Sequence, residues 1–180
     1  MLSQRPVFRK HSTAARERLA EQQQEGADPG TDITVRACGA DELRDAVSLL
    51  REQCGGGDVE GHIEELEKEL FRMRIPLMEL VVASRGTLVV GAAMVAHRYS
   101  CWSGRRAFLC GLVVAEGFRR QGIGTRLMET LAQGAMKFSA EAMEWQLAPD
   151  NEGAIRFSER MGALAEPIEQ WHDCEWPTAG

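Results

Sequence analysis

The first half of the folded part of the chain carries two stretches in which apolar residues recur at helical spacing. The first stretch follows Asp41, a residue type that often caps helix N-termini, and its apolar positions are Leu43, Ala46, Val47 and Leu50. Three glycines at 55–57 then end the pattern, because glycine is costly inside a helix. The second stretch has one apolar stripe opposite acidic residues, formed by Val59, Ile63, Leu66, Leu70 and Met73. These patterns predict two consecutive helices.

After Pro76 the helical spacing of apolar residues ends, and runs of residues that favour β-strands follow. Three apolar, β-branched runs occupy residues 77–83, 88–98 and 106–114. The intervening Arg85-Gly86 and Ser103-Gly104 are typical turn sequences, so the three runs predict an antiparallel meander. A short strand over residues 33–36 is expected before the first helix.

A β-α-β unit is expected after the meander. Residues 123–136 carry an apolar residue every fourth position, at Ile123, Leu127, Leu131 and Ala135. A strand over 142–148, a short helix capped by Asn151 and ended by Gly162, and a β-like segment over 168–175 follow. A meander joined to such a unit predicts an α/β domain whose mixed, mostly antiparallel sheet has helices on both faces.

Length and composition indicate one folded domain behind a basic N-terminal region. The chain has 180 residues, 44% of them hydrophobic, which suits a single domain with a full core. Residues 1–32 form a basic tail and a polar linker with Gly26, Pro29 and Gly30, and the domain is expected over 33–177. The first sixteen residues are basic and lack acids, which fits either a disordered tail or a mitochondrial transit segment.

Charge and cysteine usage exclude several classes of function. The net charge of −6 disfavours general nucleic-acid binding and favours a cationic partner. There is no apolar run near the roughly 20 residues that span a bilayer, so no membrane association is expected. The five cysteines are odd in number and show no zinc-type spacing, which favours reduced thiols in the cytoplasm. His172, Asp173 and Cys174 are adjacent on a predicted strand and point to opposite faces, so no metal site is expected.

The most informative motif is the loop from Arg119 to Thr125, RRQGIGT, which joins an apolar run at 109–115 to the predicted helix at 123. A glycine-containing loop at a helix N-terminus presents free N–H groups, and the two arginines add charge to the positive end of the helix dipole. Glycine at 122 and 124 keeps a Cβ away from a bound group. The loop therefore predicts a phosphate or pyrophosphate site.

This loop and two further segments resemble motifs of the GNAT superfamily of N-acetyltransferases. The family's acetyl-CoA loop reads Q/R-x-x-G-x-G/A. YSCWSGR at 99–105 resembles the Y-S-T-W-x-G-R hairpin of spermidine/spermine and thialysine N-acetyltransferases, and residues 150–163 resemble their W-N-x-x-A-I-x-F-Y-x-x-x-G-A segment. The resemblance covers residues 33–175. It implies the GNAT fold, acetyl-CoA as donor, a small-molecule primary amine as acceptor, direct transfer and a homodimer.

The resemblance assigns one half of the site to acetyl-CoA, in a splay between the strand ending at Val114 and the strand ending near Ala148. Main-chain groups of Leu112, Val113 and Val114 would bind the pantetheine arm and polarise the thioester carbonyl. The pyrophosphate is assigned to Arg119, Arg120, Gln121, Gly122, Ile123, Gly124 and Thr125. The short helix would add contacts from Asn151, Glu152, Gly153, Ala154 and Ser158. Asn151 can also be a plain helix cap, and the two roles are compatible.

The acceptor half departs from the family pattern. The relatives' Glu-Asp pair on the central strand is replaced by Cys110-Gly111, and their tyrosine on the short helix by Ser158. The only tyrosine is Tyr99, in the hairpin, so no phenol with a pKa of about 10 is available as the usual acid. Ser158 can orient the sulfur or a water molecule. Cys110, with an ordinary thiol pKa of about 8.5, can donate a proton or be a small buried hydrophobic residue.

Other acids of the relatives are partly retained. Gly56 and Gly57 stand where the relatives have an aromatic-acid pair, whereas Glu169 lies in a segment that resembles their late E-G-W. Glu116 and Glu144 can approach the reaction centre or lie on the solvated surface. Three functions follow: an N-acetyltransferase for a small primary amine, a weak or inactive acetyl-CoA-binding protein with a regulatory role, or an enzyme that acylates a protein amine.

Overall fold

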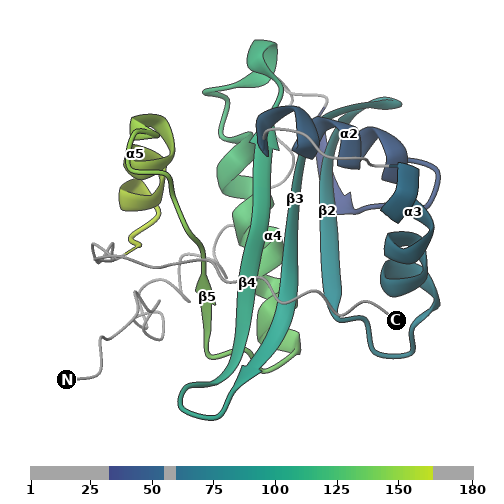
Figure 1. Ribbon diagram of the computed structural model, residues 1–180. Helices are drawn as coiled ribbons and strands as arrows, with labels where there is room; N and C mark the ends of the chain where they lie inside the picture. The colour runs from purple at the N-terminus through teal and green to yellow at the C-terminus, as the bar shows by residue number, and fades with distance from the viewer. Residues whose placement is uncertain (1–32, 55–59, 164–180) are drawn as a thin grey trace, which may run out of the picture. The chain divides into compact units, whose positions relative to one another are not determined.

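The computed structural model describes residues 33–54 and 60–163, which form two compact units divided after Gln146. The first unit contains a five-stranded sheet in the order β1-β2-β3-β4-β5 (Figure 1). The strands are β1 Ile33–Ala37, β2 Met78–Arg85, β3 Leu88–Ser100, β4 Gly104–Val114 and β5 Ala142–Glu144. Neighbours from β1 to β4 are antiparallel, and β5 is parallel to β4. The predicted meander and the mixed, mostly antiparallel sheet are confirmed.

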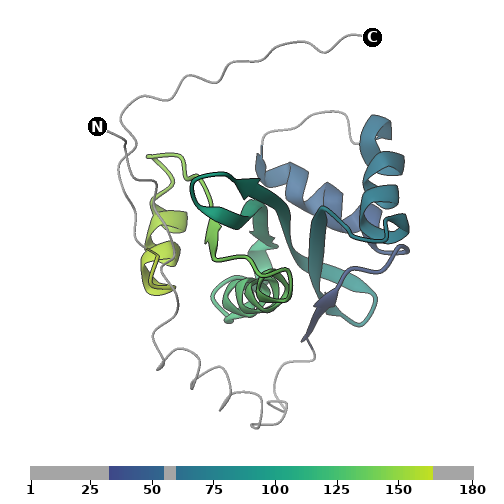
Figure 2. The ribbon, with the colours of Figure 1, turned by 90° about the horizontal axis from the view of Figure 1, so that it is seen from below.

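Helices cover both faces of this sheet, as predicted. Helix α4, Ile123–Lys137, lies on one face, and α2, Leu43–Cys54, and α3, Glu60–Glu67, lie on the other (Figure 2). Leu127 and Leu131 of α4 are fully buried, as are Val82 and Val90 of the sheet. The apolar positions that repeat along the sequence therefore form the two cores on either side of the sheet.

Two predicted elements end earlier than expected. The second helix changes to a π-helical segment at Lys68–Arg72, and Met73 leaves it in an extended conformation with 42% of its surface exposed. The wider turn adds a residue to the helix and moves Met73 out of the apolar stripe. Strand β5 ends at Glu144 instead of Ala148, because its pairing with β4 ends there and a strand needs partners for its main-chain groups. The predicted tail, linker and last β-like segment lie outside the described residues.

The connection from β1 to α2 is organised around the buried carboxylate of Glu42. The Arg36 guanidinium donates to both of its oxygens at 2.6 and 2.7 Å, and Ser84 Oγ and the Gly39 N–H donate at 3.2 and 3.3 Å. The hydrogen bond from Arg36, aided by those from Gly39 and Ser84, holds the pKa of Glu42 below its ordinary value. This network links the first strand and helix to the neighbouring strand β2.

Glu42→Gln is expected to lower the free energy of unfolding by about 1.5–3 kcal/mol at neutral pH, the typical value of hydrogen bonds to a charged group. Because the folded-state pKa of Glu42 is depressed, its contribution is present above the unfolded value of about 4.3 and is lost as the pH falls through the folded value. Urea unfolding at neutral and at acid pH measures both effects. The matched control is Glu64→Gln, at an exposed position on α3. An equal loss at both pH values would contradict this assignment.

Candidate active site

The loop before α4 has the backbone geometry of an anion site. Gly122 precedes the first residue of α4 with φ +76°, in the left-handed region, and no side chain caps the helix. Arg120 also has a positive φ, of 63°, which is uncommon for a residue with a Cβ and indicates a constrained loop. A Cβ added at Gly122 would meet no atom within 4 Å. Glycine at 122 is therefore required by its φ, and the space beside it is open to a ligand.

The N–H groups of this helix end have no acceptor in the described part of the chain. The first hydrogen bond of the α4 ladder runs from Arg126 N to Gly122 O at 3.1 Å. No acceptor among residues 33–54 and 60–163 meets the N–H groups of Gly122, Ile123, Gly124 or Thr125. Free N–H groups at the positive end of a helix dipole favour an anion, as the sequence predicts.

The same loop is folded back against the end of β4. Arg119 Nε donates to the carbonyl of Val114 at 2.9 Å, and Gln121 Nε2 donates to Gly117 O at 3.4 Å. Between them lies a short 3-10 turn, Glu116–Phe118. Arg119 therefore holds the loop close to the strand end, and Arg120 is exposed beside it.

Strand β4 has an open edge beside this loop. Its pairing with β5 covers only Arg106, Ala107 and Phe108. From Leu109 to Val114, β4 is paired in the described residues with β3 alone. Among the described residues, β4 therefore has an unpaired edge next to Leu112, Val113 and Val114, and the chain continues from this edge into the loop at 119–122. The predicted cofactor opening beside it stays a prediction.

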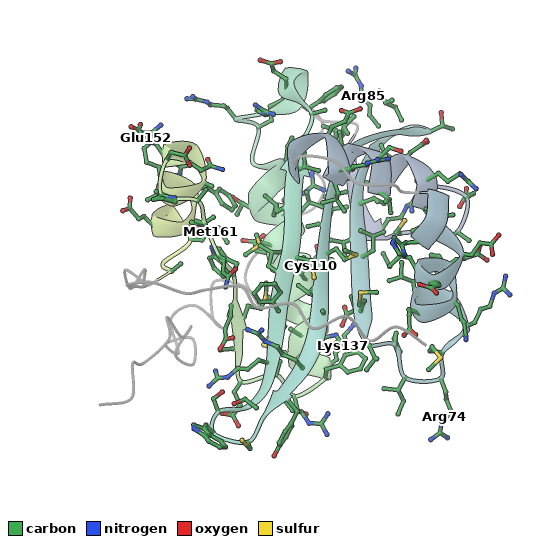
Figure 3. The ribbon with its side chains drawn as sticks, viewed as in Figure 1. Arg74, Arg85, Cys110, Lys137, Glu152 and Met161 are labelled. Carbon is green, nitrogen blue, oxygen red and sulfur yellow. The ribbon has the colours of Figure 1, made fainter. Side chains whose placement is uncertain are left out.

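Cys110 occupies a β-bulge in β4. The register passes from Val95 opposite Leu109 to Met94 opposite Gly111, which leaves Cys110 as the extra residue. Its side chain is exposed near the middle of the sheet (Figure 3), so the interpretation of Cys110 as a small buried hydrophobic residue is wrong. Partial desolvation raises the pKa of the Cys110 thiol, and contacts with the Ala96 backbone and the charge of Arg98 oppose this rise only in part. The thiol is thus protonated at neutral pH.

Glu144, expected on the solvated surface or near the reaction centre, is buried and paired with two arginines. Its Oε2 accepts a hydrogen bond from Arg98 Nη2 at 2.5 Å, and its Oε1 lies 3.6 Å from Arg106 Nε. The surface interpretation is wrong because β5 places this side chain against β3 and β4. Its charge is already compensated, so it is poorly suited to bind an amine. Glu116, in contrast, is exposed.

The second unit contains α5, Glu152–Arg160, and is described by itself. Asn151 Oδ1 accepts a hydrogen bond from Ala154 N at 3.0 Å, which confirms that Asn151 is the helix cap. Gly162, with φ +77°, follows the end of the helix as predicted. Ser158 is buried on α5, and Glu152 and Gly153 are exposed in its first turn. The assignment of these residues to the cofactor stays a prediction, and Glu169 lies outside the described residues.

Comparison with known proteins identifies the family. The model of the acetyltransferase (GNAT) family matches residues 44–163, two thirds of the chain. The chain belongs to the GNAT acetyltransferase family. The mouse thialysine N-epsilon-acetyltransferase is 32% identical over 85 residues, which are 44% of this chain and 47% of the relative. The human spermidine/spermine N(1)-acetyltransferase-like protein 1 is 30% identical over 88 residues, 48% of this chain and 13% of the relative.

Solved structures show that the fold is also that of GNAT enzymes. The aminoglycoside acetyltransferase AAC(6')-Iy, in complex with the bisubstrate analogue CoA-S-monomethyl-acetylneamine, superposes with a TM-score of 0.69 at 17% identity. The match covers 79% of this chain and 98% of that one. At such identity the likeness concerns the fold alone. The GNAT chain itself spans about half the length of the thialysine enzyme that it matches.

Sequence reasoning missed three residues next to Glu144 in this GNAT domain: Arg98, Arg106 and Phe108. Arg98 and Arg106 stand at the two ends of predicted apolar strands, and an arginine at each strand end is ordinarily a solvated position. The available signal was that both arginines face each other across the predicted hairpin. Among the described residues, no three His, Cys, Asp or Glu side chains are grouped to hold a metal ion, and no helix is long and apolar enough to cross a membrane.

Proposed function

We propose that this GNAT protein transfers the acetyl group of acetyl-CoA directly to a small primary amine. The observation that carries the proposal is the continuity of two features: the open edge of β4 at Leu112–Val114, and the loop whose free N–H groups follow at Gly122. Within the described residues, these features combine an extended main-chain edge with an anion seat. A pantetheine arm and a pyrophosphate need that combination.

In this proposal the loop at 119–125 binds the pyrophosphate of acetyl-CoA, and the open edge of β4 binds its pantetheine arm. The N–H groups of residues 122–125, with the charge of Arg120, hold the pyrophosphate, and Arg119 keeps the loop against Val114. Main-chain groups of Leu112–Val114 align the pantetheine arm and donate to the thioester carbonyl as negative charge develops on its oxygen. Asn151–Ala154 and Ser158 complete the proposed cofactor contacts from α5.

The transfer itself requires few side chains. The lone pair of the deprotonated amine attacks the thioester carbon, the carbon–sulfur bond breaks, and the CoA thiolate takes up a proton while the amine loses one. Cys110, a thiol before the reaction, gives its proton to the CoA thiolate and regains one from the nitrogen that has attacked, and Ser158 orients the sulfur. CoA is a modest leaving group, so a weak acid suffices. We further propose a homodimer in the cytoplasm.

A second candidate function is a weak or inactive acetyl-CoA-binding protein with a regulatory role. The observation in its favour is that Cys110, Gly111 and Ser158 stand in place of the relatives' acid and base groups. The cofactor half of the site serves both functions equally. Only turnover distinguishes the two.

A CoA-release assay with a panel of primary amines, beside calorimetric titration of acetyl-CoA, tests the proposal. We expect acetyl-CoA to bind and at least one small primary amine to raise CoA release about tenfold or more above hydrolysis. Spermine is expected to be a poor acceptor because the Glu-Asp pair is missing. Binding without amine-dependent turnover would establish the second candidate, and absence of binding would contradict both.

A further inference from the structure

The peptide group at the end of β4 is held by hydrogen bonds on both sides. The N–H of Ala115 donates to the carbonyl of Val90 on β3 at 2.9 Å. The carbonyl of the same peptide group, that of Val114, accepts from Arg119 Nε at 2.9 Å. Main-chain groups of successive residues in an antiparallel strand alternate between its two sides. Val114, which lies opposite Gly91, therefore directs its own N–H and carbonyl away from β3 and toward the open edge.

The same alternation identifies the residues of β4 that face the open edge. Val113 lies opposite Ala92 and directs its N–H and carbonyl toward β3. Leu112 and Val114 direct theirs toward the edge. Of the main-chain groups directed there, the Val114 carbonyl is bound by Arg119. The contacts proposed for the pantetheine arm thus come from Leu112 and Val114, and the side chain of Arg119 reaches the same edge.

Arg119 also closes the turn that connects β4 to the loop before α4. The N–H of Phe118 donates to Ala115 O at 2.9 Å, which begins the turn. The N–H of Arg119 donates to Glu116 O at 3.2 Å, and its guanidinium returns to the strand end. The next residue, Arg120, takes a left-handed φ of 63°. Arg119 therefore fixes the loop relative to the edge just before the chain turns toward the helix.

The hydrogen bond from Arg119 to Val114 lies at the surface, so its effect is local. The Arg119 side chain is exposed, and water replaces exposed hydrogen bonds at little cost to the stability of the fold. The guanidinium nevertheless fixes the plane of the last peptide group of β4. It also covers the negative end of a carbonyl dipole beside the proposed pyrophosphate seat. Arg119 is thus placed to act on the geometry of the edge.

We propose that Arg119 is a positioning residue of the transfer, which aligns the open edge of β4 with the thioester through the carbonyl of Val114. The proposal rests on the function proposed above, because the edge belongs to the same donor site. Main-chain donors that are aligned in advance with the developing oxyanion accelerate acyl transfer, and a small misplacement costs a large factor. Loss of the Arg119 anchor should therefore slow transfer even from a donor that has no phosphate.

Acetyl-pantetheine separates positioning from phosphate binding, because it keeps the thioester and the pantetheine arm of acetyl-CoA but has no phosphate. Arg119→Met is expected to lower kcat about tenfold or more with either donor and the most active amine of the panel. Arg119→Lys, which keeps a donor for the Val114 carbonyl, should recover most of this loss. Arg120→Met should raise the KM of acetyl-CoA far more than that of acetyl-pantetheine. The control Arg105→Met, at an exposed position at the other end of β4, should change neither.

Amide hydrogen exchange over residues 112–123 provides a readout that needs no donor. Arg119→Met should speed exchange there severalfold relative to both the wild type and Arg120→Met. The temperature of thermal unfolding should stay within about 2 °C of the wild type, since the lost bond is exposed. Unchanged exchange in Arg119→Met would contradict the positioning role whether or not the protein turns over an amine.

The two donors also distinguish failure of this inference from failure of the proposed function. A loss confined to acetyl-CoA in Arg119→Met would make Arg119 a phosphate ligand, which overturns the positioning role and leaves the function standing. Full activity of this variant with both donors would do the same. Absence of turnover in the wild type, with faster exchange and weaker calorimetric binding of acetyl-pantetheine in Arg119→Met, would sink the acetyltransferase function and leave the positioning role standing.

Discussion

Gly122→Ala is expected to weaken acetyl-CoA binding by about tenfold or more. The new Cβ meets no protein atom within 4 Å, so its effect on the protein is limited to the strain of a left-handed φ, about 1–2 kcal/mol. The Cβ instead projects into the open space where the proposed pyrophosphate would contact the loop amides. Such a contact depends on close approach of backbone and ligand, which is why a single methyl group has a large effect. Calorimetric titration of acetyl-CoA measures it.

Gly86 offers a matched control for this substitution. It has φ +60° in the turn between β2 and β3, and a Cβ there also meets nothing within 4 Å. Gly86→Ala should therefore lower the thermal stability about as much as Gly122→Ala, while acetyl-CoA affinity stays at the wild-type value. Equal affinities of the two variants would show that the loop at 122 is not the pyrophosphate seat.

Glu144→Gln is expected to lower the free energy of unfolding by about 3–5 kcal/mol, the cost of breaking a buried ion pair on one side. The loss of its charge leaves the buried Arg106 with no acidic partner among the described residues. Arg106→Met, in contrast, leaves Glu144 bonded to Arg98 and replaces a buried charge by an apolar side chain of similar length, so we expect a change within about 1 kcal/mol. Urea unfolding curves of the two variants provide the comparison.

The expected difference in unfolding free energy between Glu144→Gln and Arg106→Met tests whether the Arg106 charge is needed for stability. A loss of stability in Arg106→Met as large as that in Glu144→Gln would show that Arg106 is a structural residue.

The antiparallel strands and the helices that cover them could be predicted from the sequence because each element has a local pattern of apolar residues and turn residues. Alternating apolar runs between turn sequences predicted β2, β3 and β4, and the four-residue spacing from Ile123 predicted α4. The loop at 119–125 was recognisable for the same reason, since glycines, arginines and a helix start lie next to one another in the chain. Local chemistry was enough to predict the loop and the start of α4, and the role of this loop as an anion site stays a prediction.

The end of a strand and the position of a bulge depend on pairing with a partner strand, so neither could be predicted from the sequence. Strand β5 ends at Glu144 because its pairing with β4 ends there. Cys110 is exposed because it lies in a bulge that shifts the register between β3 and β4. Glu144 is buried and bonded to Arg98, which lies 46 positions away in the chain, so its neighbours in the sequence do not indicate its burial. Tertiary contacts override local preference at such positions.

The most direct test of the acetyltransferase assignment is the molar ratio of acetylated amine to released CoA thiol, measured by mass spectrometry and thiol titration in the same reaction of the protein with the most active amine of the panel. Direct transfer predicts one N-acetylated product for each CoA released, at a rate that depends on the amine. Release of CoA without acetylated amine, or tight acetyl-CoA binding with no release at all, would contradict it.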